Sequence, residues 1–177
     1  MFRKAVARRI GLGSIAIAIV ILGAGLMGRA PAVRVVDMLD RCDPDSFNEV
    51  FGAGTCVFDH PGVSLDTFLR VLGNSGQIGS WNFSPRQPQL KQGQAVQAQN
   101  SGGEVHTFTE VAEFGGGFIQ ELNDLTGNPV PAPECLDFAT IEFIPAGGSN
   151  APDVVDVGEH KYMCCIHPWM RATVTVK

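Results

Sequence analysis

The spacing of apolar positions changes near residue 80. Residues 43–51 begin with a proline-containing capping sequence and then carry apolar side chains at helical spacing, up to the glycines of residues 52–54. Residues 61–74 repeat this arrangement and end at Gly73-Asn74. The pattern predicts two short helices within a helical prefix, residues 33–79. Because so short a segment cannot bury a core alone, we expect it to pack on the following domain.

From residue 80 onward, apolar and polar side chains alternate over short segments that turns separate. The alternation is clear in residues 96–98 and again in residues 172–177. Short strands at this spacing are typical of an all-β domain, a β-sandwich or a Greek-key barrel. We therefore expect one β-domain over residues 80–177, interrupted by a long loop rich in glycine, asparagine and proline at residues 115–133.

The N-terminal segment, residues 1–32, has the pattern of an export signal. Basic residues within the first nine positions precede an uncharged stretch, residues 10–28. This stretch is also about as long as a membrane-spanning helix. The segment is therefore either a signal peptide, with Ala30-Pro31-Ala32 as the cleavage site that we favour, or a membrane anchor. In both cases we expect an exported protein of the periplasm or cell envelope, secreted or anchored at its N-terminus.

Without the N-terminal segment, the chain is strongly acidic. That segment holds five of the 13 basic residues and none of the 18 acidic ones, which leaves 8 basic residues against 18 acidic residues and a net charge of −10. An acidic surface argues against binding to nucleic acid or anionic lipid. The composition instead favours a soluble protein with basic protein partners.

The five cysteines also bear on function. Disulfides persist outside the cytoplasm, and an odd number of cysteines leaves one thiol for another purpose. The other four can pair in three ways, among which the sequence alone does not choose. We expect Cys42 to pair with Cys56, since they bracket a short segment, and Cys135 with Cys165.

The strongest chemical pattern is Cys164-x2-His167-x2-Met170, placed where a predicted strand ends in a turn. It combines a thiolate, an imidazole and a thioether. Soft sulfur with imidazole selects copper, and two histidines, one cysteine and a distant axial methionine form an electron-transfer copper site. A cysteine and histidine at this spacing could also bind zinc or simply be buried, but Met170 favours copper.

A second histidine must come from another part of the chain. The candidates are His60, His106 and His160. We favour His106, because it follows the predicted strand at residues 96–98 and can reach the turn. His60 lies in the helical prefix, and His160 lies on the strand that leads into Cys164, where it projects away from the turn.

These residues resemble the cupredoxins, the family of type 1 blue copper proteins, and in particular its plastocyanin- and amicyanin-like group. Residues 162–171 resemble the C-terminal copper loop, and residues 83–106 resemble the first half of the domain. The resemblance covers about residues 80–177 and implies a Greek-key β-sandwich that holds one copper ion. The family pattern makes three residues the strong ligands and one the weak axial ligand: His106, Cys164 and His167, with Met170 as the axial ligand.

The resemblance also implies how electrons leave the site. His167 is expected to present its ring edge at the surface, and a redox partner protein to dock near His167, Pro168 and Trp169. Thr107 departs from the family, which commonly has asparagine after the first histidine. The hydrogen bond between the two ligand loops is therefore expected to differ.

We expect a single-electron carrier rather than an enzyme. A multicopper oxidase would need many more histidines than the four in this chain. A module that stores, delivers or senses copper without electron transfer is an alternative, as is a metal-free interaction domain on the same scaffold.

Overall fold

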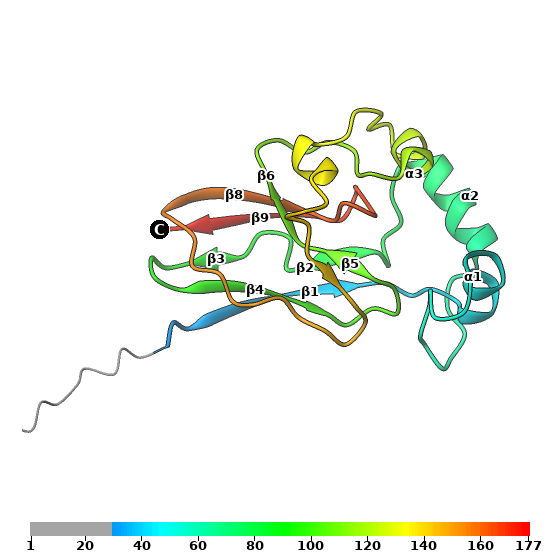
Figure 1. The fold of residues 1–177 in the computed structure, drawn as a ribbon, viewed down its shortest axis with the longest axis horizontal. Coiled ribbons are helices and arrows are strands. Elements are labelled where there is room, and N and C mark those ends of the chain that lie inside the picture. Colours follow the sequence, from blue (N-terminus) through cyan, green and yellow to red (C-terminus); the bar gives the residue numbers. More distant parts are fainter. Residues whose placement is uncertain (1–29) are drawn as a thin grey trace, which may run out of the picture.

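A computed structural model describes residues 30–177 (Figure 1). Nearly all of the predicted signal or anchor segment, residues 1–29, lies outside the described residues. Within residues 30–177, no helix has the length and apolar character that crossing a membrane requires.

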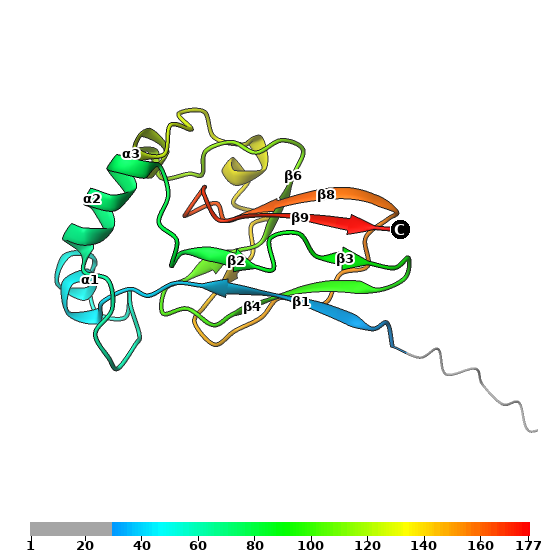
Figure 2. The same ribbon diagram turned by 180° about the vertical axis from the view of Figure 1, so that it is seen from behind.

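Two β-sheets form the body of the protein, as Figures 1 and 2 show from opposite sides. The first sheet has the strand order β2-β1-β4 and the second has the order β3-β9-β8-β6. A small third sheet pairs β5 with β7. The strands are β1 (Val33–Leu39), β2 (Asn82–Ser84), β3 (Gln89–Leu90), β4 (Ala95–Asn100), β5 (His106–Thr107), β6 (Thr109–Val111), β7 (Phe143–Ile144), β8 (Gly158–Met163) and β9 (Arg171–Val176). This mostly β architecture agrees with the predicted sandwich.

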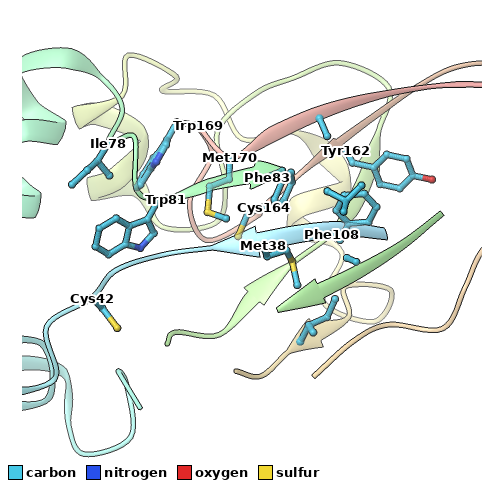
Figure 3. Close-up of a cluster of buried hydrophobic side chains, with 14 of the residues drawn as sticks. Met38, Cys42, Ile78, Trp81, Phe83, Phe108, Tyr162, Cys164, Trp169 and Met170 are labelled. Atoms are coloured by element: carbon cyan, nitrogen blue, oxygen red, sulfur yellow. The ribbon is translucent and has the colours of Figure 1, made fainter. Parts of the chain in front are cut away.

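The core follows from alternation along the strands. In β9, Ala172, Val174 and Val176 are buried, while the residues between them are partly exposed. Figure 3 shows side chains from both sheets in one cluster, with Met38 of β1 and Tyr162 of β8 among them. Successive strand residues point to opposite faces, so each sheet turns an apolar face inward and removes it from water.

β1 was not predicted from the sequence, because it lies within residues 33–79, which were expected to form a helical prefix. It is the central strand of its sheet, parallel to β4 and antiparallel to β2. Only Val36 and Met38 of this strand are fully buried, and Val33 and Val35 are exposed. The alternation is too weak to predict a strand, and its pairing partners lie far along the chain.

The two predicted helices are confirmed as α1 (Pro44–Phe51) and α2 (Leu65–Ser75). Asp43 and Ser64 cap their first turns by accepting hydrogen bonds from backbone N–H groups. The predicted end of the second helix at Gly73-Asn74 is two residues early, because the left-handed residue that ends it is Gly76, with a φ of 67°.

Both helices pack against one end of the sheets (Figure 1). The Phe68 ring of α2 lies 4.9 Å from that of Trp81 and 5.8 Å from that of Trp169, measured between centroids. The Phe47 ring of α1 lies 5.6 Å from that of Phe68. The expected packing of the helices on the β-domain is therefore confirmed, and aromatic rings form the contact.

Both predicted disulfides, Cys42–Cys56 and Cys135–Cys165, are present. The second joins the 164–170 turn to Cys135, which lies just after the segment predicted as a long loop, residues 115–133. That segment contains a short helix, α3 (Gln120–Leu125), and a 3-10 helix, Pro133–Leu136, begins at its end. Gly117 lies so close to the Cys165 carbonyl that a Cβ atom would collide with it. The loop is therefore packed against the turn.

We predict that Phe68→Ala lowers the free energy of unfolding by about 3–5 kcal/mol, because it leaves a cavity among the aromatic rings. Leu69→Ala is the matched control on the same helix, and we expect it to cost less than about 1 kcal/mol because Leu69 is 43% exposed. Urea denaturation of both variants measures the difference. Equal losses would show that α2 does not pack as described.

Candidate metal centre

Three donor atoms from distant parts of the chain meet inside the protein. The Nδ1 atoms of His106 and His167 lie 3.2 Å apart, and the Cys164 Sγ atom lies 3.8 Å from the first and 3.9 Å from the second. All three residues are buried. The structure therefore brings together the three predicted strong ligands.

Backbone hydrogen bonds hold two of these residues in one turn between β8 and β9. The Cys164 N–H donates to the Met170 carbonyl over 3.0 Å, and the Met170 N–H donates to the His167 carbonyl over 2.9 Å. Met170 is fully buried, and Figure 3 shows its side chain beside that of Cys164. The turn thus holds the predicted fourth ligand close to Cys164 in the core.

The Cys164 sulfur accepts two backbone hydrogen bonds. The N–H groups of Thr107 and His167 each lie 3.4 Å from it. Such donors stabilise negative charge on the sulfur. They also join β5 to the 164–170 turn, so both segments that supply ligands hold the same atom.

Thr107 provides a second connection between these segments. Its hydroxyl oxygen accepts a hydrogen bond from the Cys165 N–H over 2.8 Å. Although threonine replaces the expected asparagine at this position, its side chain therefore still links the two segments by a hydrogen bond.

Asp40 is a residue of the site that sequence reasoning missed. Its Oδ2 atom lies 2.9 Å from Nε2 of His106, and both side chains are fully buried. The N–H groups of Glu104 and Cys42 donate to the same carboxylate over 3.0 and 3.1 Å. A carboxylate at Nε2 keeps a proton there and leaves Nδ1 to face the sulfur. Asp40 follows the unpredicted strand β1, so no sequence signal connected it with His106.

Burial and neighbouring charges shift the pKa values of these groups in opposite directions. Burial opposes ionisation of the Cys164 thiol, but hydrogen bonds and charge from His106 and His167 outweigh it and hold its pKa well below the usual range. Burial likewise opposes protonation of His106, yet Asp40 and Cys164 raise its pKa to about 9. The pKa of Asp40 falls to about 2, despite burial, because His106 and backbone N–H groups stabilise the carboxylate.

The donor set fits one metal ion. Ligand bonds of about 2.0–2.3 Å at tetrahedral or trigonal angles separate donor atoms by about 3.3–3.7 Å, close to the 3.2, 3.8 and 3.9 Å found here. One thiolate, two imidazoles and a neighbouring thioether suit copper. A second buried group, Asp40, Cys42 and Glu104, lacks a free thiolate because Cys42 is in a disulfide.

The other two candidate histidines lie apart from this group. His60 is exposed and its ring stacks on that of Phe58, with centroids 4.9 Å apart. Nδ1 of His160 pairs with a Glu110 carboxylate oxygen at 2.7 Å near the surface. Both contacts are those of ordinary surface residues.

The expected exposure of the His167 ring edge is wrong. His167 is only 3% exposed, and Pro168 and Trp169 are buried as well. The rings of Phe68 and Trp169 lie 6.4 and 5.3 Å from that of His167, centroid to centroid. A Glu104 carboxylate oxygen lies 3.8 Å from its Nε2 atom. The cause is helix α2, which lies outside the resemblance and covers this side.

Comparisons with known proteins found distant structural likenesses. No family model and no curated protein matches the chain. The M98A mutant of amicyanin with Cu(I) is 17% identical over 54% of this chain and 73% of its own, with a TM-score of 0.38. A purple cupredoxin from Nitrosopumilus maritimus is 20% identical over 56% of this chain and 86% of its own, with a TM-score of 0.40. These values do not establish a family.

We predict that Asp40→Asn changes how the stability of the metal-free protein depends on pH. The raised pKa of His106 stabilises the wild-type fold fully below the unfolded-state pKa of about 6.5, and this stability is lost as the pH rises through about 9. Without the Asp40 charge the pKa of His106 falls, so the loss occurs at lower pH. Urea denaturation between pH 6 and 10 measures it.

The matched control for this prediction is Glu110→Gln, which removes the carboxylate from the other histidine–carboxylate pair, at His160. It should leave the loss of stability near pH 9 in place. Identical pH profiles for Asp40→Asn and the wild type would contradict the role given to Asp40.

Proposed function

We propose that this chain is an exported, mononuclear type 1 copper protein with a cupredoxin-like Greek-key fold, and that it carries single electrons. The observation that supports this most strongly is the buried group of His106, Cys164 and His167, whose donor atoms have the spacing that one ion requires. Copper held there would supply one-electron chemistry by cycling between Cu(I) and Cu(II). Met170 would be the weak fourth ligand.

The surrounding residues suit this function because they hold the donors still. The Cys135–Cys165 disulfide fixes the turn next to Cys164. Asp40 fixes the ring of His106 from behind. A site with little freedom to rearrange keeps nearly the same geometry in both oxidation states, which favours fast electron transfer.

The burial of the proposed ligands favours an electron carrier over the alternative function. A storage or delivery protein must release copper to a partner, which requires that ligands reach the surface. All three strong ligands are buried here. We therefore favour electron transfer over storage, delivery or sensing, and we propose no enzymatic reaction for this site.

The partner is proposed to be a redox protein rather than nucleic acid. Since α2 covers His167, the partner would approach the helical face over His167, Pro168 and Trp169 instead of touching these residues directly. An extracytoplasmic location fits the two disulfides, which persist in oxidising compartments.

We predict that the purified protein binds one Cu(II) ion and becomes intensely blue or purple through thiolate-to-copper charge transfer. Cys164→Ser should abolish the visible band, because hydroxyl oxygen cannot replace the thiolate. His160→Ala and His60→Ala are matched controls that should keep it. Visible absorption during copper titration measures all four proteins, and a colourless wild-type product would refute the proposal.

We predict that the protein recovered from its source cell lies outside the cytoplasm with both disulfides formed. Cell fractionation, N-terminal sequencing and thiol counting measure location, cleavage of the predicted segment at residues 1–32, and oxidation. Recovery from the cytoplasm with five reduced cysteines would contradict the proposed location.

A further inference from the structure

A cavity of about 560 Å³ lies directly over His167. Helices α1, α2 and α3, the loop at residues 104–105 and Ile166 surround it. Most of its walls are apolar, and they include Phe68 and Leu69 of α2 and Leu122 of α3. Its volume is within the range of small-molecule sites, about 300–1,000 Å³.

The polar groups of the cavity are few, and two of them are acidic: the exposed Glu121 and the buried Glu104. Glu104 lines the cavity and is only 9% exposed. Its Oε2 atom accepts a hydrogen bond from Nε1 of Trp81 over 2.6 Å. No residue among 30–177 donates a hydrogen bond to its Oε1 atom, which is not fully shielded from water. This oxygen can therefore accept a hydrogen bond from a ligand, and a cationic donor forms the strongest bond with it.

The charges on the helices around the cavity also favour a cationic ligand. The three helices carry five acidic residues and a single basic one, Arg70. The acidic residues are Asp45, Glu49, Asp66, Glu121 and Asp124. Such a field raises the local concentration of cations and repels anions.

We propose that this cavity is a binding site for a small organic cation, an ammonium group on an alkyl or aryl body. The alkyl or aryl body fills the cavity and displaces water from its apolar walls. The ammonium group donates to Glu104, next to His167. Binding at this site does not require copper. Because the cavity lies over His167, the ligand would occupy the side on which the proposed redox partner approaches.

Three probes that share one naphthylmethyl body test the charge requirement: 1-naphthylmethylamine, 1-naphthylmethanol and 1-naphthaleneacetate. We expect the amine to bind about tenfold or more tightly than the alcohol, since hydrogen bonds to charged groups are worth about 1.5–3 kcal/mol. The acetate should bind most weakly. Isothermal titration calorimetry of the full chain, with and without copper, measures the affinities.

Two substitutions locate the binding. Glu104→Gln should bring the affinity for the amine down to that for the alcohol. Leu69→Lys places a competing cation at the cavity and should weaken amine binding by about tenfold or more. Leu136→Lys is the matched control, because Leu136 is 55% exposed and lies outside the cavity. It should change the affinity by less than about twofold.

Several outcomes would overturn the proposal. These are no binding of the amine, equal binding of the amine and the acetate, and equal weakening by Leu69→Lys and Leu136→Lys. Binding of a lysine-rich protein at this face without binding of the amine would also overturn it, since the site would then be a protein interface. Amine binding by a protein that takes up no copper would refute only the proposed function.

Discussion

The negative charge on the Cys164 sulfur is the feature around which the rest of the structure is arranged. A buried thiolate is unfavourable unless other groups compensate it. Here two imidazoles lie within 3.9 Å of the sulfur and two backbone N–H groups point at it. These groups come from two segments that are distant in the sequence, so compensating the charge also joins β5 to the 164–170 turn.

The helical prefix takes part in this arrangement through Asp40. This carboxylate continues the chain of charges from the sulfur through the ring of His106, and it lies two residues before the disulfide-bonded Cys42. A buried carboxylate without its partner would be strongly destabilising. The N-terminal strand, the first disulfide and the two helices therefore belong to the support of the site, although the resemblance to cupredoxins does not extend to them.

Most parts of the structure that sequence reasoning predicted have a local signal, although the Cys135–Cys165 pair and the choice of His106 join distant residues. The spacing of Cys164, His167 and Met170 lies within seven residues, and the helix caps at Asp43 and Ser64 are visible in short motifs. What it missed depends on contacts between distant segments. β1 is recognisable only beside β4, Asp40 only beside His106, and the burial of His167 only once α2 is in place. No pattern within one short window contains that information.

The direction of β1 fixes how the domain would be oriented on a surface. Its first residue, Val33, lies at the end of the sheets opposite the helices, and its last, Leu39, leads to them (Figures 1 and 2). A strand of seven residues spans roughly 23 Å at about 3.3 Å per residue. If the chain were tethered to a bilayer through the residues before it, the helical end would point outward into the aqueous phase. It would then be accessible to soluble molecules rather than to those embedded in the lipid.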